Sequence, residues 1–251
     1  MKNRLFTPLA FAALLSLAHA GTVSDSQLNY VANYRDRQQQ PNLPAPEAQL
    51  LNTDAEPGLT DGFSSLFNGH DLTGWVRKGG AHRFEIQDGV LVGTCVPGSP
   101  NAFLCTEQEF TDFIFTCEMK WEVDSNSGIM FRARSKTDDK GKVTVYGPQC
   151  EMEGIENKRG WSGGIYGEKA GGWFYPLWLE AHEEVRQALK ADHWNRITIQ
   201  AEGDTVKTWV NGIPAAHWNN AEYRKGFFGL QVHAGKQGKV CWRNIKLKEL
   251  K

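Results

Sequence analysis

Along four short stretches of the sequence, side chains that could transfer protons or bind hydroxyl groups alternate with apolar ones. Alternate residues of an extended chain point to the same side, so each stretch would present its polar residues on one face of a strand. These polar rows consist of Gln149, Glu151 and Glu153; Gly128, Met130 and Arg132; Gln231 and His233; and Glu118 and Lys120. Their mixture of carboxylates, Arg, His and amides indicates a sugar-binding sheet face, with an ordinary solvated surface as the alternative.

A second feature that could contribute to a site is an aromatic, glycine-containing segment over residues 161–179. Its aromatic residues are Trp161, Tyr166, Trp173, Phe174, Tyr175 and Trp178, with Tyr146 just upstream. The length and glycine content of the segment predict a long loop, and long ordered loops in compact domains are often functional. Flat rings can stack on the apolar faces of a sugar. The alternative is a loop that its own aromatic residues fix to the core.

The elements that must position these residues are short β-strands. From residue 63 onwards, aromatic and β-branched runs are separated by Gly, Asn and Asp, which is typical of an antiparallel all-β domain. We expect strands over residues 63–67, 83–87, 90–94, 103–106, 110–121, 127–134, 143–153, 195–202, 205–210, 226–232 and 240–249. Asp88-Gly89 and Asn211-Gly212 predict tight turns between them. Short helices are expected only over residues 181–189 and 29–40.

The N-terminal part of the chain differs in character from the rest. Residues 1–20 combine a charged start, an apolar run and Ala18-His19-Ala20, which predicts a cleaved secretory signal and hence a periplasmic or secreted protein. A retained membrane anchor is the alternative, and no later stretch is apolar enough to span a membrane. Residues 21–61 are rich in Gln, Asn, Pro and Ala, which predicts a linker or a loosely ordered arm.

Net charge limits the expected partners, and the cysteines limit the expected disulfides and metal sites. The formal net charge is only -1, so no overall positive field favours a nucleic acid or an anionic membrane as partner. The five cysteines are Cys95, Cys105, Cys117, Cys150 and Cys241, an odd number without zinc-site spacing. We expect either a Cys95–Cys105 disulfide or five buried thiols.

Several phrases of the sequence together resemble the 3-keto-disaccharide hydrolase family of exported bacterial proteins. They are Leu66-Phe67-Asn68-Gly69, Asp71-Leu72-Thr73-Gly74-Trp75, Asp88-Gly89-Val90-Leu91, Asn126-Ser127-Gly128-Ile129, Gly147-Pro148-Gln149, Trp194-Asn195, Gly229-Leu230-Gln231-Val232-His233 and Trp242-Arg243-Asn244-Ile245. The resemblance covers residues 62–251 and implies a concanavalin-like jelly-roll sandwich of two antiparallel sheets. The chain departs from the family pattern after Gly147-Pro148, where its acid and amide positions are exchanged.

The resemblance implies a hydrolase or lyase that acts on 3-keto-glycosides or 3-keto-disaccharides. The C3 carbonyl acidifies the C2 hydrogen, so a base can remove that proton, the aglycone can leave by elimination, and water can then add. The candidate catalytic residues are His233 or Glu151 as base, Arg132 or a divalent cation of the Ca²⁺ or Mn²⁺ type for the enolate, and Glu153 or Glu118 as acid or metal ligand. The candidate substrate-binding residues are Asn126, Gln149, Gln231, Tyr166, Trp173, Tyr175 and Lys120.

Two other functions are compatible with the same residues. A non-catalytic carbohydrate-binding module could be built on the same sandwich, because a fold does not determine a function. A conventional glycoside hydrolase needs two carboxylates, and Glu151 and Glu153, two residues apart on one strand, would lie roughly 7 Å apart. The expected partner in every case is a small carbohydrate.

Overall fold

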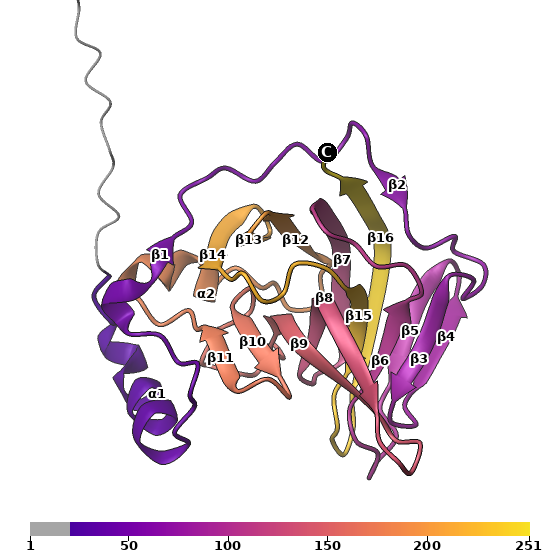
Figure 1. The fold of residues 1–251 in the computed structure, drawn as a ribbon, viewed down its shortest axis with the longest axis horizontal. Coiled ribbons are helices and arrows are strands. Elements are labelled where there is room, and N and C mark those ends of the chain that lie inside the picture. The colour runs from indigo at the N-terminus through magenta and orange to yellow at the C-terminus, as the bar shows by residue number, and fades with distance from the viewer. Residues whose placement is uncertain (1–20) are drawn as a thin grey trace, which may run out of the picture.

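The computed structural model describes residues 21–251, which form a sandwich of two antiparallel β-sheets (Figure 1). The larger sheet has the order β1 (Leu50–Leu51), β14 (Ile213–Asn219), β13 (Thr205–Val210), β12 (Asn195–Glu202), β7 (Phe113–Val123), β16 (Lys239–Glu249), β5 (Val90–Thr94) and β4 (Arg83–Gln87), with β2 (Ser64–Ser65) beside β16. The smaller sheet has the order β11 (Gly172–Tyr175), β10 (Ile165–Glu168), β9 (Val143–Met152), β8 (Ser127–Thr137), β15 (Phe227–Val232), β6 (Ala102–Thr106) and β3 (Trp75–Gly79). The predicted all-β sandwich is therefore confirmed, while the predicted signal peptide lies outside the described residues.

The core lies between the two sheets and is built from the apolar side of each alternating strand. Phe115 of β7 in the larger sheet stacks on Phe228 of β15 in the smaller sheet, with ring centroids 4.5 Å apart. On β9, Cys150 and Met152 are fully buried in the same core. Alternation then directs the intervening residues of β9 and β15 to the opposite face of the smaller sheet.

The predicted tight turns and most of the predicted strands are present. Asp88 and Asn211 adopt positive φ values of 49° and 52°, each followed by a glycine with positive φ, as the two-residue hairpin turns require. Residues 161–179 are not one long loop, because β10 and β11 form a hairpin within them. Most of their aromatic side chains are buried, and the Trp161 and Trp173 rings meet edge to face at 4.8 Å. The interpretation as a segment fixed to the core by its aromatics is the one that the structure supports.

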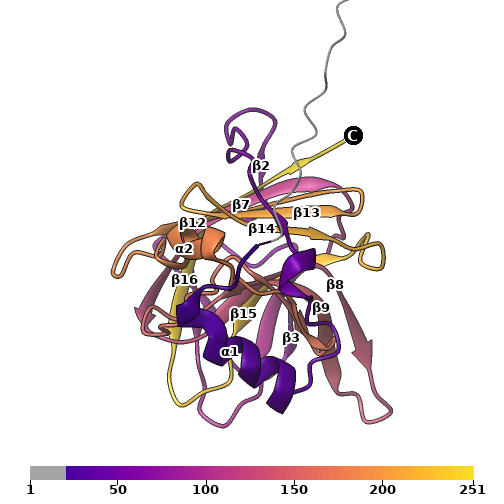
Figure 2. The same ribbon diagram turned by 90° about the vertical axis from the view of Figure 1, so that its left-hand side faces the viewer.

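Residues 21–61 form an ordered strap, not the predicted linker or loosely ordered arm. This N-terminal strap contains η1 (Asp25–Gln27), α1 (Leu28–Ala32), η2 (Asn33–Arg37) and η3 (Pro46–Ala48). Figure 1 shows α1 beside the β10–β11 end of the smaller sheet, and Figure 2 shows the same helix at the front of the molecule, on the side that faces the viewer. Apolar packing and amide hydrogen bonds both hold the strap: Val31 is buried in the core cluster, and Tyr30 and Leu43 pack against that cluster. Gln49 donates to Pro176 O at 2.9 Å and Asn52 donates to Thr208 O at 3.0 Å.

All five cysteines are buried free thiols, so the predicted Cys95–Cys105 disulfide is absent. The Cys105 thiol faces the backbone carbonyl of Phe103, and the Cys95 thiol faces that of Gly235. The alternative expectation of five buried thiols is confirmed. A helix long and apolar enough to cross a membrane is not found within residues 21–251.

Candidate functional site

A cavity of about 800 Å³ lies against the face of the smaller sheet that is turned away from the larger sheet. One row of residues crosses the floor of the cavity through the paired strands β9, β8, β15, β6 and β3. It runs from Glu151 through Gly128, Gln231 and Phe103 to Lys78. A carboxylate, an amide and an ammonium group therefore lie in line on one sheet face.

The sheet is curved so that its edges close round the cavity. Lys78 Nζ of β3 lies 3.3 Å from Ser135 Oγ near the end of β8. Asn101 Nδ2, just before β6, lies 3.5 Å from Glu168 Oε1 of β10. These contacts join strands that are not neighbours in the sheet order, and they explain how a single sheet can enclose a ligand-sized space.

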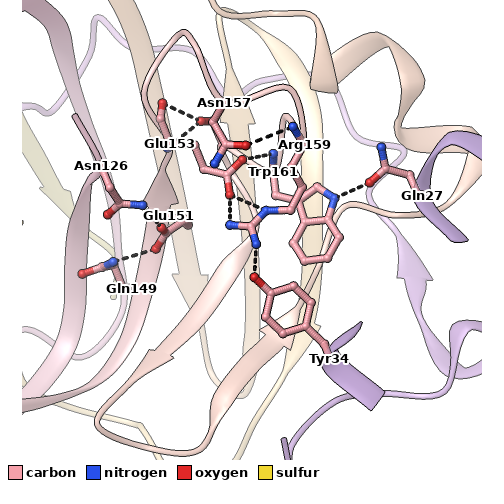
Figure 3. A network of polar contacts seen from close by, with 10 residues as sticks. Gln27, Tyr34, Asn126, Gln149, Glu151, Glu153, Asn157, Arg159 and Trp161 are labelled. Carbon is pink, nitrogen blue, oxygen red and sulfur yellow. Dashed lines mark hydrogen bonds and ion pairs between the residues drawn. The ribbon is translucent and has the colours of Figure 1, made fainter. Parts of the chain in front are cut away.

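Glu151 is a cavity carboxylate whose pKa is shifted far from its ordinary value, and Figure 3 shows the two amides that hold it. Its side chain is nearly fully buried, and burial raises its pKa to about 7. Asn126 Nδ2 donates to one carboxylate oxygen at 2.6 Å, and Gln149 Nε2 donates to the other at 2.7 Å. These hydrogen bonds lower the pKa but do not offset desolvation, to which the charge of Glu153 adds. Glu151 is thus a carboxylate that can gain or lose a proton near neutral pH.

A glycine makes room for the amide that holds Glu151. A Cβ atom added to Gly128 would lie 2.3 Å from Cδ of Gln149. The Gln149 side chain therefore lies directly over Gly128 on the cavity floor and reaches Glu151 from there. Any side chain at position 128 would displace the amide.

Two buried amides of the cavity have unused hydrogen-bonding atoms. Neither Nε2 nor Oε1 of Gln231 finds a partner among the described residues, although the side chain is 0% exposed. Oε1 of Gln149 is also without a partner within residues 21–251. Buried polar groups are nearly always paired, and leaving one unpaired costs about 1–3 kcal/mol. Such atoms beside a cavity indicate a polar ligand that completes them.

His233 and Glu168 lie on the wall formed by the closing edges. His233 Nδ1 donates to the carbonyl of Ala234 at 2.7 Å, which leaves Nε2 for a ligand. Burial raises the pKa of Glu168, and the charges of Lys169 and His233 oppose this effect. His233 is thus close enough to Glu168 for its charge to lower the pKa of that carboxyl.

Glu153 is a buried partner of Arg159 and does not line the cavity. Arg159 donates through Nε and Nη2 to one oxygen of Glu153, and the backbone N–H of Trp161 donates to the other oxygen at 2.8 Å. Nη1 of Arg159 donates to the Tyr34 hydroxyl of the strap (Figure 3). The predicted role of Glu153 as acid or metal ligand therefore has no free oxygen to support it, and the residue instead holds Arg159 at the edge of the cavity.

The structure brings many of the predicted site residues together. Those that line the cavity are Asn126, Gln149, Glu151, Tyr166, Trp173, Gln231 and His233. Trp173 is only 1% exposed and packs against the Trp161 and Tyr166 rings, so it has little surface left to stack on a sugar. Tyr175 lies outside the cavity, buried, where its hydroxyl donates to Leu50 O and faces His182.

Arg132 lies outside the cavity because the alternation of β8 breaks before it. A register shift falls between Met130 and Arg134, and Arg132 has a φ of 46°. The guanidinium is 0% exposed and forms an ion pair with Asp112 at 2.9 Å. It also donates to backbone carbonyls, including Thr111 O at 2.7 Å. The predicted enolate-stabilising role is replaced by a structural one at one end of the sandwich.

Glu118 and Lys120 belong to β7, which is a strand of the larger sheet, so they lie far from the row of Glu151. Glu118 accepts from Arg243 Nε at 2.6 Å. Lys120 Nζ and the Arg243 guanidinium lie over the Trp194 ring, 5.4 and 4.2 Å from its centroid. The predicted catalytic role of Glu118 and binding role of Lys120 are therefore not supported by their positions.

The domain family follows from comparison with known sequences. The profile of the 3-keto-alpha-glucoside-1,2-lyase-like domain matches residues 62–248. The chain belongs to this family. No curated protein sequence matches the chain.

Solved structures with the same fold support the jelly-roll architecture predicted for this lyase-like domain. A provisionally assigned glycosyl hydrolase from Parabacteroides distasonis is similar over 79% of this chain and 100% of its own, with 21% sequence identity and a TM-score of 0.53. A second one from this organism covers 75% of this chain and 99% of its own, at 20% identity and a TM-score of 0.51. A Bacillus subtilis protein of unknown function with a galectin-like fold covers 78% and 98%, at 14% identity and a TM-score of 0.54.

Several lining residues of the lyase-like domain and the strap were not predicted from the sequence. They are Tyr34, Gln38, Gln40, Arg77, Lys78, Asn101, Arg159, Glu168 and Lys169. The lining residues within the lyase-like domain reach the cavity because the smaller sheet is curved and because a turn precedes Trp161. Neither feature is a local sequence pattern. The lining residues of the strap lie outside the matched domain.

The donor set of the lyase-like domain does not match the predicted Ca²⁺ or Mn²⁺ site. Within residues 21–251, no group of three or more His, Cys, Asp or Glu side chains is arranged to hold a metal ion. In the cavity, both oxygens of Glu151 already accept hydrogen bonds from amides.

Proposed function

We propose that the protein cleaves 3-keto-glycosides by elimination, with Glu151 as the base that removes the C2 proton. The observation that carries the proposal is a buried carboxylate held between two amide donors, beside a further amide with both polar atoms unpaired. The membership of the 3-keto-alpha-glucoside-1,2-lyase-like family supports the choice of substrate class. The likeness in fold to provisionally assigned glycosyl hydrolases is compatible with it.

The elimination needs a base whose carboxylate is available near neutral pH. In a 3-keto-glycoside the C2–H bond breaks, its proton passes to Glu151, and its electron pair forms an enolate with the C3 carbonyl. The enolate then forms a C1–C2 double bond as the C1–O bond breaks, and the leaving oxygen takes up a proton. Addition of water to C1 of the resulting enone returns the proton to C2 and completes a net hydrolysis. A raised carboxylate pKa increases the strength of the base for the first step.

The other polar groups of the cavity supply the remaining requirements. Gln231 Nε2, an unpaired N–H donor in the same row as Glu151, is suited to the developing enolate oxygen. Lys78 continues that row and adds positive charge. His233 has Nε2 free to exchange a proton with the leaving oxygen or with the attacking water.

The surroundings of Glu151 and Glu153 fit a conventional glycosidase or a binding module less well than an elimination enzyme. A glycosidase of the two-carboxylate type would need Glu151 and Glu153 side by side, and Glu153 is occupied by Arg159 and the Trp161 N–H. A binding module would need hydroxyl partners but no desolvated carboxylate with a near-neutral pKa. Elimination is the function that uses Glu151 as the structure presents it. The signal-like pattern of residues 1–20 supports the further proposal that the enzyme acts in the periplasm or outside the cell.

The proposal is tested by incubating the purified mature chain with a 3-keto-glucoside and with its unoxidised parent, with and without a chelator. We expect aglycone release from the keto substrate alone, and no loss of rate with the chelator. Equal release from both substrates would favour a conventional glycosidase. Release from neither, with binding retained, would favour a binding module, and chelator sensitivity would require a metal.

A further inference from the structure

We infer that the N-terminal strap is a specificity-determining wall of the cavity, which restricts the substrate to short glycosides. The inference rests on the proposed function for the identity of the reaction. It concerns residues 21–61, which lie outside the matched family domain of residues 62–248.

The strap contributes directly to the cavity. Tyr34, Gln38 and Gln40 all line it. These side chains are polar and uncharged, and the Gln40 amide lies 3.3 Å from that of Gln38. Hydroxyls and amides are suited to sugar hydroxyl groups, whereas Lys78 and Lys169 supply positive charge elsewhere on the lining. The strap side thus offers hydrogen-bonding groups to the hydroxyl groups of a sugar.

The strap is fastened so closely to the β10–β11 hairpin that no chain of sugars could pass between them. Gln40 Oε1 accepts from Trp173 N at 2.9 Å, and Asn42 Nδ2 donates to Ala170 O at 2.6 Å. A Cβ atom on Gly172 would lie 2.4 Å from Cδ of Gln40, and one on Gly171 would lie 2.2 Å from Nδ2 of Asn42. These two glycines also have positive φ values of 88° and 106°. The strap therefore closes this side of the cavity.

The strap is also linked to the residues around Glu151. Tyr34 accepts a hydrogen bond from Arg159, whose guanidinium lies 4.5 Å from the Trp161 ring centroid and 5.1 Å from that of Trp173. Gln27 of the strap accepts from Trp161 Nε1 at 2.7 Å. The wall is consequently part of one packed unit with the cavity, and it is not a separate lid.

The experiment compares cleavage of a 3-keto-disaccharide and a 3-keto-trisaccharide by the wild type, Gln40→Ala and Gln38→Ala. We expect the wild type to prefer the disaccharide. In Gln38→Ala, kcat/KM for the disaccharide should fall by about tenfold through KM, as loss of a neutral hydrogen bond to the sugar would cause. Gln40→Ala removes a contact that fastens the strap to the hairpin, and it should weaken disaccharide cleavage by loosening the wall. The ratio of trisaccharide to disaccharide cleavage should rise at the same time.

Asn29→Ala is the matched control, because it removes an exposed amide of the same strap that does not line the cavity. Thermal melting should show all three variants folded, and Gln38→Ala keeps the test valid if Gln40→Ala is unstable. An unchanged cleavage ratio in folded Gln38→Ala and Gln40→Ala would overturn the inference. If the wild type cleaves neither keto substrate, calorimetric binding of the unoxidised disaccharide and trisaccharide applies the same criterion. The strap inference then stands or fails separately from the proposed reaction.

Discussion

Two polar rows that look alike in the sequence have opposite environments in the structure. The row of Glu151 and Gln149 lies on the cavity face of the smaller sheet, where Glu151 is desolvated and neighbouring amides keep unpaired atoms. The row of Glu118 and Lys120 lies on the larger sheet, where Glu118 pairs with Arg243 and solvent reaches both charges. Alternation of polar and apolar residues therefore indicates a polar sheet face, but it does not distinguish a ligand-binding site from an ordinary solvated surface. Burial with incomplete hydrogen bonding makes that distinction.

Replacing Glu151 is expected to have the largest effect on activity. Glu151→Gln keeps the shape of the side chain but removes the base, so kcat should fall by about 10²–10⁴-fold. The measurement is aglycone release from a 3-keto-glucoside at saturating substrate. Glu118→Gln is the matched control, because it makes the same chemical change in the other row. Equal losses in both variants would remove the distinction between the rows.

Arg159→Met should have the largest effect on stability. It leaves Glu153 buried without its charged partner, and breaking a buried ion pair costs about 3–5 kcal/mol in free energy of unfolding. Urea denaturation followed by tryptophan fluorescence measures this loss. The double variant Glu153→Gln/Arg159→Met should recover part of the stability, since it removes the uncompensated charge. A single variant as stable as the wild type would show that the pair is unimportant.

Gln231→Leu should separate activity from stability. The amide has no partner among the described residues, so an apolar side chain of similar volume should leave the melting temperature unchanged or raise it. Loss of a donor to the enolate should lower kcat by on the order of 10²-fold. The two readouts are calorimetry and the cleavage assay. A large fall in melting temperature would mean that Gln231 serves the fold rather than a ligand.

The pH dependence should follow the raised pKa of Glu151, which is about 7 against an ordinary value near 4.5. The rate constant kcat/KM should fall by about tenfold per pH unit below 7, as the base becomes protonated. The free energy of unfolding should change with pH in the opposite direction to kcat/KM. Between about pH 4.5 and 7 the folded protein binds a proton that the unfolded chain has lost, so the free energy of unfolding decreases as pH rises through this window.

Glu151→Gln removes this titrating group and is the control for both profiles. Its free energy of unfolding should lack the decrease between about pH 4.5 and 7 that the wild type shows. Denaturation curves at several pH values measure the difference. Identical profiles in the two proteins would mean that the pKa of Glu151 is not raised in the folded state.

Local patterns predicted the strands β4, β5, β12 and β13 to the residue, because tight turns and β-branched runs define them. Alternation along β9 and β15 likewise predicted that Glu151 and Gln231 would lie on the polar face. It failed at Arg132, where a bulge interrupts the period, and it could not show that Glu118 lies in the other sheet. The assignment of a strand to a sheet depends on pairing between distant strands. The position of the strap depends on amide and apolar contacts with distant residues, which composition does not reveal.

The most direct test of the account is a kinetic isotope effect. In the wild type near pH 7, a 3-keto-glucoside carrying deuterium at C2 should release its aglycone more slowly than the unlabelled substrate. Glu151→Gln should show almost no release from either substrate. An equal rate for both isotopologues under conditions where chemistry limits turnover, or full activity in Glu151→Gln, would contradict the claim that Glu151 removes the C2 proton.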